Sequence, residues 1–154
     1  MAYAKDTNVS QTASLLEIER TLERYGADQF MYGRKTDCAV IGFVMAGRQV
    51  RIQVTMPDKT DRHFWKTETG RDRTESAAIK EWEQACKQRY RALALVVKAK
   101  LEAVEAGITT FEEEFMAHLV LPGGETVGQR LMPEISEAQR SGKLPPLLPH
   151  LNNS

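Results

Sequence analysis

The sequence predicts an α+β domain in which a small antiparallel sheet of three to four strands packs on one long helix. Residues 38–45 form an apolar run, and after a two-residue turn residues 49–56 alternate polar and apolar side chains, which together is the pattern of a β-hairpin. Residues 74–107 instead repeat apolar side chains at helical spacing, without proline and with glycine only at the end. Shorter helical patterns precede the hairpin and follow the long helix, which gives the order α-β-β-β-α-α.

The composition is that of a single soluble domain. The chain has 154 residues, of which 42% are hydrophobic and 27% charged, and its formal net charge is zero. We expect residues 1–13 to be disordered, residues 14–143 to form the domain, and residues 144–154 to be an extended Pro/Leu tail. The N-terminus lacks the apolar stretch of a signal peptide, and the longest apolar run, Ala92–Val97, is too short to span a membrane. A cytoplasmic protein without a membrane partner is expected.

The first predicted helix covers residues 14–25. Ser14 and Glu17 have the spacing of a capping box, in which each side chain bonds a free backbone N–H of the first turn. Gly26 is expected to end the helix. Apolar residues recur between these limits at helical spacing, at Leu15, Ile18, Leu22 and Tyr25.

Three strands are expected next, at Gln29–Tyr32, Cys38–Met45 and Gln49–Met56. If Ala46 and Gly47 form a two-residue turn, every apolar residue of the last strand meets an apolar residue on the same face, and this match fixes the register. The expected pairs are Met45 with Arg48, Phe43 with Val50, Ile41 with Ile52, and Ala39 with Val54. The other face carries Arg51 opposite Gly42 and is therefore shallow.

The remaining elements are shorter. A polar segment, residues 57–73, precedes the long helix, and a further strand is expected around residues 63–67. After the long helix, two alternative capping boxes predict another helix: Thr109 with Glu112, and Thr110 with Glu113. A turn follows at residues 122–124, and residues 126–140 have the pattern of a short helix that Pro133 restarts or kinks.

The long helix has two contrasting sides when its residues are placed at intervals of about 100°. Its core-facing side consists of Ile79, Trp82, Cys86, Tyr90, Leu93, Val97, Leu101 and Val104. The opposite side carries four cations, Lys80, Lys87, Arg91 and Lys98, which we call the basic row and which extends over about 27 Å. Such a row is either an ordinary solvated face or a surface that follows the phosphates of a nucleic acid.

Arg89 and Lys100 break this pattern because they point toward the apolar side of the long helix. A charge left unpaired at the edge of a core costs on the order of several kcal/mol. We therefore expect both cations to form buried ion pairs, or to extend their side chains to solvent; the alternative is an anion pocket built on Arg89. The candidate carboxylates are Glu17, Glu19, Asp37 and the acidic cluster at residues 112–114.

Cations and aromatic residues alternate in the run Arg62-His63-Phe64-Trp65-Lys66. Aromatic rings stack on unpaired bases while cations bind phosphates, a combination that suits single-stranded nucleic acid. The predicted nucleic-acid site consists of Arg51, Arg62, Phe64, Trp65, Lys66, Arg71, Arg73, Lys80, Lys87, Arg91 and Lys98. The alternative is that Phe64 and Trp65 alternate, so that one points into the core and the other is partly exposed.

The charge along the chain is uneven. Residues 48–100 carry 13 basic against 7 acidic residues, whereas residues 101–154 carry 3 against 8. This distribution favours either a surface for a polyanion or two surfaces that pair with each other, as in a homo-oligomer.

No motif for catalysis, cofactor binding or metal binding is present in the sequence. The three histidines lie far apart, and no Cys/His pair has the spacing of metal ligands. Cys38 and Cys86 fall in apolar patterns and are expected to be buried free thiols. The carboxylates open to a metal-dependent nuclease are Glu17, Asp37, Glu68 and Asp72, and nothing in their spacing singles them out.

Three segments, YGADQFMYG, AVIGFVMAGRQVRIQV and WEQACKQRYRALALVVKAKLEAVEAG, resemble an uncharacterised group of small bacteriophage proteins. The resemblance covers residues 14–148. No active site is established for that group, so the resemblance implies no residue roles. It implies a role in replication, recombination or counter-defence in the cytoplasm of a bacterial host.

Three functions are therefore open. The first is a non-enzymatic protein that binds nucleic acid, with single-stranded DNA favoured. The second is a protein-interaction or inhibitor module that acts on a host factor, to which the LPPLL motif at residues 144–148 would add a ligand for a partner's groove. The third is a metal-dependent nuclease. Self-association is a further expectation, because a sheet of three or four strands has edges that need protection.

Overall fold

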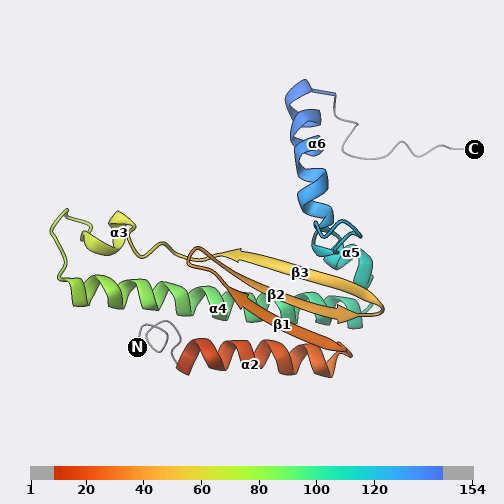
Figure 1. Ribbon diagram of the computed structural model, residues 1–154, viewed down its shortest axis with the longest axis horizontal. Helices are drawn as coiled ribbons and strands as arrows, with labels where there is room; N and C mark the ends of the chain where they lie inside the picture. The colour runs from red at the N-terminus through yellow and green to blue at the C-terminus, as the bar shows by residue number, and fades with distance from the viewer. Residues whose placement is uncertain (1–8, 144–154) are drawn as a thin grey trace, which may run out of the picture.

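The computed structural model of the protein describes residues 9–143 and has the expected α+β architecture (Figure 1). A three-stranded antiparallel sheet packs against helices, the longest of which is central. The elements in order are α2 (Val9–Arg24), β1 (Gln29–Arg34), β2 (Cys38–Met45), β3 (Arg48–Thr55), α3 (Arg62–Trp65), α4 (Glu75–Glu105), α5 (Phe111–Phe115), the 3₁₀ helix η1 (Met116–His118) and α6 (Val127–Ser141).

The sheet has the order β1-β2-β3, and the predicted register of the hairpin is confirmed pair by pair. Phe43 faces Val50 and Ile41 faces Ile52 on the inner side, while Gly42 faces Arg51 on the outer side. Ala46 and Gly47 both have positive φ angles, of 52° and 71°. Two positive φ angles define the type I′ turn, whose twist matches that of the two strands it joins.

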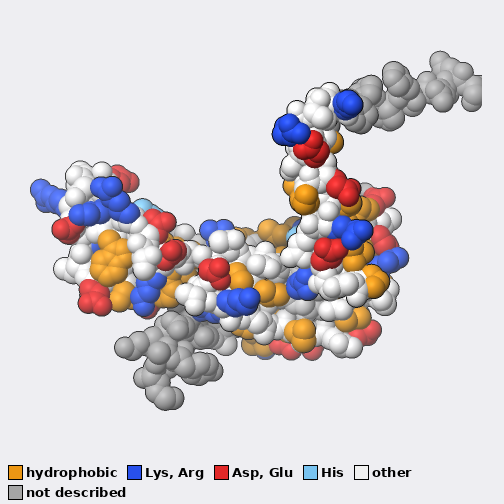
Figure 2. All heavy atoms as spheres, turned by 45° about the horizontal axis from the view of Figure 1, so that its top comes forward, with side chains coloured by type: hydrophobic (Ala, Val, Ile, Leu, Met, Phe, Trp, Pro, Cys, Tyr) orange, Lys and Arg blue, Asp and Glu red, His pale blue; other side chains and the backbone are white. Residues whose placement is uncertain are grey.

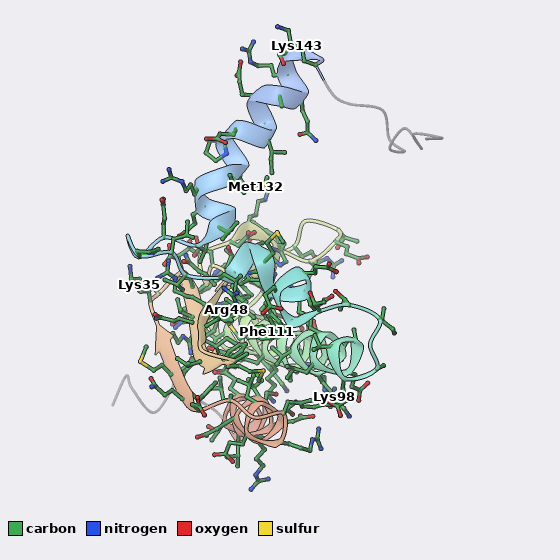
Figure 3. The ribbon with its side chains drawn as sticks, turned by 90° about the vertical axis from the view of Figure 1, so that its right-hand side faces the viewer. Lys35, Arg48, Lys98, Phe111, Met132 and Lys143 are labelled. Carbon is green, nitrogen blue, oxygen red and sulfur yellow. The ribbon has the colours of Figure 1, made fainter. Side chains whose placement is uncertain are left out.

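The core lies between the inner face of the sheet and the helices α2, α4 and α5. In the end-on view of Figure 3 the sheet lies on one side of α4 and α2 lies below it. The main apolar cluster includes Ile18, Leu22, Ile41, Phe43, Val50, Ile52, Leu93, Val97, Leu101, Phe111 and Phe115. A second cluster consists of Ala39, Met56, Phe64, Trp82, Cys86 and Tyr90. The predicted apolar side of the long helix therefore faces the core.

The first helix begins earlier than the sequence predicted. It starts at Val9, so the expectation that residues 9–13 are disordered is wrong, and the proposed Ser14–Glu17 capping box falls inside the helix. Gln11, in the first turn, is 3% exposed. This first turn therefore packs against the rest of the protein. Residues 1–8 and the Pro/Leu tail, 144–154, lie outside the described residues.

Two further expectations are settled by local geometry. Residues 63–67 do not form a strand, because α3 is a short helix and only an isolated bridge joins Lys66 to Asp72. Of the two alternative capping boxes after α4, the Thr110 side chain is the cap, accepting from the Glu113 N–H at 3.1 Å. Between Val9 and Ser141, none of the helices combines the length and the apolar character that crossing a membrane would require.

Candidate interaction surfaces

The segment between β3 and α4 is held together by its own polar groups. The Asp61 carboxylate caps α3 by accepting from the His63 N–H at 3.1 Å, and it also contacts Nδ1 of the His63 ring at 2.7 Å. These bonds, first from the ring and then from the backbone, lower the pKa of Asp61. The four-residue helix α3 is therefore fixed by a cap from the residue that directly precedes it.

Arg73, a predicted phosphate ligand, instead joins the C-terminal end of this segment to α3. Its guanidinium donates to the backbone carbonyl of His63 at 2.9 Å and to that of Phe64 at 3.2 Å. Lys66, another predicted ligand, forms an ion pair with Asp72. Both cations are engaged within the protein, which corrects the expectation that they present free charge to a nucleic acid.

The two aromatic residues of this segment are not free stacking platforms. Phe64 is 4% exposed in the second apolar cluster, so its predicted role in base stacking is corrected to a core role. Trp65 is half-buried, and its indole N–H donates to the Lys59 carbonyl at 2.9 Å. Arg62 and Arg71 remain exposed, and their side chains have no hydrogen-bond or ion-pair partner among residues 9–143.

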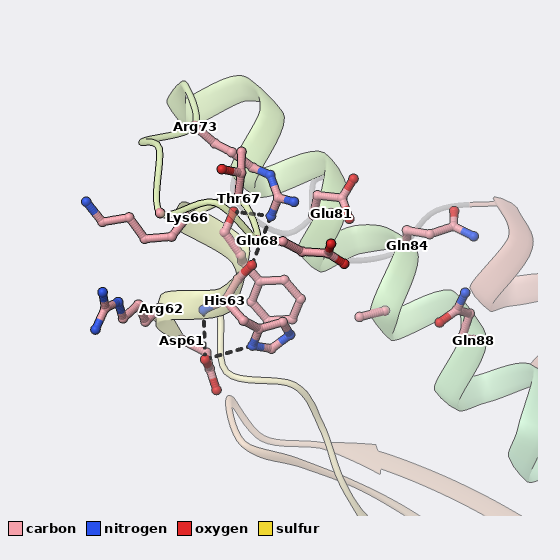
Figure 4. A pocket seen from close by; sticks show the side chains of 13 residues that line it. Asp61, Arg62, His63, Lys66, Thr67, Glu68, Arg73, Glu81, Gln84 and Gln88 are labelled. Carbon is pink, nitrogen blue, oxygen red and sulfur yellow. Dashed lines mark hydrogen bonds and ion pairs between the residues drawn. The ribbon is translucent and has the colours of Figure 1, made fainter.

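An open groove of about 780 Å³ lies between this segment and the first half of α4 (Figure 4). Arg62 and Lys66 point outward from it, whereas Arg73 turns in toward the carbonyl groups of α3. The cations that line the groove are Arg62, Lys66 and Arg73, and the carboxylates are Asp61, Glu68 and Glu81. Three charges of each sign give the groove no preference for a polyanion.

The basic row is only partly confirmed as an exposed surface. Lys80, Arg91 and Lys98 are exposed and Lys87 is half-buried, and none has a hydrogen-bond or ion-pair partner within the described part of the chain. The exposed side of α4 also carries Leu95, which is 61% exposed, and Val96, which is 47% exposed. The row therefore shares the solvent face of α4 with apolar side chains.

Arg51 lies away from the basic row, on the outer face of the sheet. Its guanidinium donates to the Gly124 carbonyl at 2.7 Å and to Oε1 of Gln129 at 3.1 Å. The Val120 N–H bonds the Gln49 carbonyl at 2.9 Å, so the segment before α6 covers the free edge of β3. Because α4 packs on the inner face, the predicted nucleic-acid residues do not share one surface.

Of the two cations predicted to need carboxylate partners, only Lys100 has one among residues 9–143. Its Nζ lies 3.2 Å from Oε1 of Glu114, within the predicted acidic cluster, and 5.7 Å from the centre of the Phe115 ring. Partial burial, and then the charge of Lys100, lower the pKa of His118 beside this pair. Arg89 is exposed and has no partner among the described residues, so it extends to solvent, the alternative to a buried ion pair that the sequence analysis allowed.

The helix α6 is a surface whose importance the sequence analysis missed. It projects from one end of the domain, and none of its residues is buried (Figure 1). Leu131, Met132 and Ile135 are 39%, 54% and 45% exposed, and Figure 2 shows hydrophobic side chains beside charged ones on this helix. The signal was present in the sequence, because Val127, Leu131, Ile135 and Ala138 recur at helical spacing.

The described residues form no site for metal binding or for thiol chemistry. Among residues 9–143, no group of three or more His, Cys, Asp or Glu side chains is placed to hold a metal ion. Cys38 and Cys86 are both buried, as predicted, and neither forms a disulfide bond within residues 9–143. The carboxylates considered for a nuclease therefore have no metal-binding cluster in this part of the chain.

Comparison with known proteins gives no family assignment. No family model, curated protein or solved structure matches this chain. The resemblance to small bacteriophage proteins stays a prediction, and the function has to be argued from the surfaces described above.

Proposed function

We propose that the protein is a non-catalytic protein-binding module that docks on another polypeptide through α6. The observation that supports this is a fifteen-residue helix that buries none of its residues and has Pro133 in its interior. Isolated helices of this length are marginal in water, and an interior proline costs about 3 kcal/mol. A helix of this kind gains stability when its apolar side packs on a partner.

The caps of α6 stabilise it without replacing such a partner. The Thr126 hydroxyl accepts from the Gln129 N–H at 3.2 Å, and the Gln129 side chain accepts from the Thr126 N–H at 2.8 Å. Gly142 ends the helix in the left-handed conformation. A cap contributes about 1 kcal/mol, which is less than the cost of an interior proline. The apolar side chains can therefore stabilise the helix more than the caps do, but only when a partner covers them and removes them from water.

The chemistry of α6 indicates what kind of site would receive it. Its apolar residues lie along one side, whereas Arg130, Glu134 and Glu137 flank that side, Arg140 lies farther round the helix, and the four charges cancel. A helix with one apolar side and no net charge fits an apolar groove or a matching helix rather than a charged surface. Protein is therefore the class of partner that we propose for it.

The test is affinity capture with the full chain from cells that produce it. We expect at least one protein to be recovered in stoichiometric amount. The double substitution Leu131→Glu and Ile135→Glu should abolish the recovery, because each change places a charge in the apolar contact. Losing two central contacts of this kind lowers affinity by about 30-fold or more.

The matched control for the capture experiment is Ser136→Glu, which adds the same charge to the polar side of α6, where Ser136 is exposed. It should leave recovery unchanged. Recovery that is the same for the double variant, the control and the wild type would contradict a docking role for α6. Because α6 buries no residue, neither variant should unfold the monomer.

Single-stranded nucleic acid is a second candidate ligand, favoured by the unpartnered cations of the basic row. A row of about 27 Å is long enough to follow several nucleotides. Replacing Lys80, Arg91 and Lys98 together with glutamine should then weaken binding of a labelled DNA strand. The slope of log affinity against log salt should fall by about 2, since each phosphate contact on a single strand contributes about 0.7.

Fluorescence anisotropy at low and moderate salt would measure both effects. Arg89→Gln is the control, because Arg89 is an exposed cation of the same helix outside the basic row. Absence of binding at low salt, or equal losses in the control and the triple variant, would rule out the basic row as a nucleic-acid surface.

A further inference from the structure

We propose that the polypeptide that covers α6 is α6 of a second copy of this chain, paired antiparallel about a two-fold axis. This inference rests on the proposed function, because it names the partner of the same helix. The three arguments for it are the arrangement of the apolar side chains, the order of the charges along one flank, and the accessibility of the helix.

The apolar side chains of α6 are arranged for a self-complementary contact. Leu131 and Ile135 are one turn apart in the middle of the helix and are both exposed. A two-fold axis between them places Leu131 of each copy beside Ile135 of the other. The small residue Ala138 lies on the same apolar side, beyond Ile135, where a small side chain allows the helices to approach closely.

The charges on one flank of α6 specify the antiparallel direction. Arg130, Glu134 and Glu137 lie within about 60° of one another around the helix, next to the apolar side. In an antiparallel pair, equal flanks face each other, so Arg130 of each copy meets Glu134 and Glu137 of the other. A parallel pair would instead set this flank against the side that carries Met132 and Gln139, which offers no opposite charge.

These charges are free to exchange partners when two helices meet. Arg130 now pairs with Glu125 at 3.0 Å, and Glu137 pairs with Arg140 at 2.5 Å, but all four side chains are largely exposed. Exposed ion pairs contribute about 0–1 kcal/mol, so replacing them by pairs across an interface costs little.

The position of α6 leaves room for a second helix beyond its first turn, which packs on η1. It projects beyond the sheet and α4 in two perpendicular views (Figures 1 and 3). Its base is packed tightly, because a Cβ atom added at Gly128 would lie 2.9 Å from the Ala117 carbonyl oxygen. The helix is therefore presented to solvent in a defined direction.

Residues 144–154 of the same chain are a less suitable cover for α6. Their sequence, LPPLLPHLNNS, is rich in leucine but contains no lysine, arginine, aspartate or glutamate. It could cover apolar side chains, yet it offers no partner for the charged flank. The second copy satisfies both the apolar and the charged parts of the surface.

Sedimentation of the full chain between about 1 and 200 µM tests the inference. A pair of helices about 22 Å long forms a small interface, so we expect a reversible dimer with a Kd on the order of 10 µM. Leu131→Glu combined with Ile135→Glu should weaken dimerisation by about 30-fold or more, whereas Ser136→Glu should leave it unchanged.

A charge exchange tests the antiparallel arrangement itself. Arg130→Glu alone, and Glu134→Lys combined with Glu137→Lys, should each weaken self-association by setting like charges against each other. Mixing the two variants should restore dimers, because every charged contact between the two different chains is again between opposite charges. Restoration on mixing is not expected if any other surface mediates the dimer.

Two results would overturn the inference. One is a wild-type chain that stays monomeric at about 200 µM, a concentration well above the expected Kd. The other is a dimer that the α6 substitutions or the charge exchange leave unaffected. Neither result decides the proposed function, because capture of a different protein that depends on Leu131 and Ile135 would still support docking through α6.

Discussion

Replacing Phe115 with alanine is expected to lower the free energy of unfolding by about 3–5 kcal/mol. The Phe115 side chain is fully buried at the point where the sheet, α4 and α5 meet. Its ring packs edge-on against Phe43, with 5.7 Å between ring centroids, and lies 5.1 Å from Phe111. The substitution removes both ring contacts and leaves a cavity that the surrounding strands and helices cannot fill by small shifts.

Urea unfolding followed by circular dichroism would measure this loss. Met116→Ala is the matched control, because Met116 is the next residue and is 49% exposed. A change at an exposed position normally stays within about 0.5 kcal/mol. Equal losses for the two variants would contradict the position that the structure gives to Phe115.

The hairpin could be predicted in full because one short stretch of sequence contains all the information for it. The turn residues Ala46 and Gly47 fix the point of reversal, and the alternation of apolar residues fixes which side faces inward. A shift of one residue would turn Val50 and Ile52 outward, so only one register buries them. The long helix was predictable for the same reason, because its apolar period persists over many turns.

The segment before α4 could not be predicted because polar contacts within the segment, together with the packing of Phe64 in the core, decide its structure. The aromatic run at residues 63–67 fits a strand, but α3 forms because Asp61 caps it and Arg73 bonds the carbonyl groups at its end. Phe64 then packs against residues from the sheet and α4. A pattern of alternating cations and aromatic residues does not reveal that these side chains are engaged with one another.

The orientation of side chains at the edge of the long helix was predictable only in part. Arg89 and Lys100 occupy almost the same direction around α4, but they lie about 16 Å apart along it. Lys100 is near enough to α5 to reach Glu114, whereas Arg89 has no described element beside it that supplies a carboxylate. Helical periodicity gives the direction of a side chain but not the element that it meets.

The apolar side of α6 shows a different limit. Its residues could be read from the sequence, and an amphipathic helix is normally assumed to pack on its own domain. Only the structure shows that the segment from Leu119 to Thr126 follows the edge of β3 and directs α6 away from the core. The apolar side of α6 is thus exposed because the chain turns away from the core before this helix begins. The local sequence of α6 does not reveal that direction.

Replacing Arg73 with methionine is expected to destabilise the protein by about 1.5–3 kcal/mol, the range for hydrogen bonds made by a charged group. Arg73 is half-buried and donates to the two carbonyl groups that follow one another at the end of α3. Without these bonds, the carbonyl groups of His63 and Phe64 lose their guanidinium donor, and Phe64 is held less firmly in the second apolar cluster. Methionine retains much of the length and apolar character of the arginine stem, so the change removes mainly the donors.

Hydrogen exchange would localise this effect and separate it from a general loss of charge. The amide groups of Phe64 and Lys66, which bond Asp61 and Arg62, should exchange faster in the Arg73→Met variant, while those of β2 should change only through the lower global stability. Arg71→Met removes the same charge two residues away, where the side chain is exposed and has no described partner, and should change stability by less than about 0.5 kcal/mol. If Arg71→Met were as destabilising as Arg73→Met, the loss would come from net charge, and the guanidinium–carbonyl bonds would not be what holds α3 against α4.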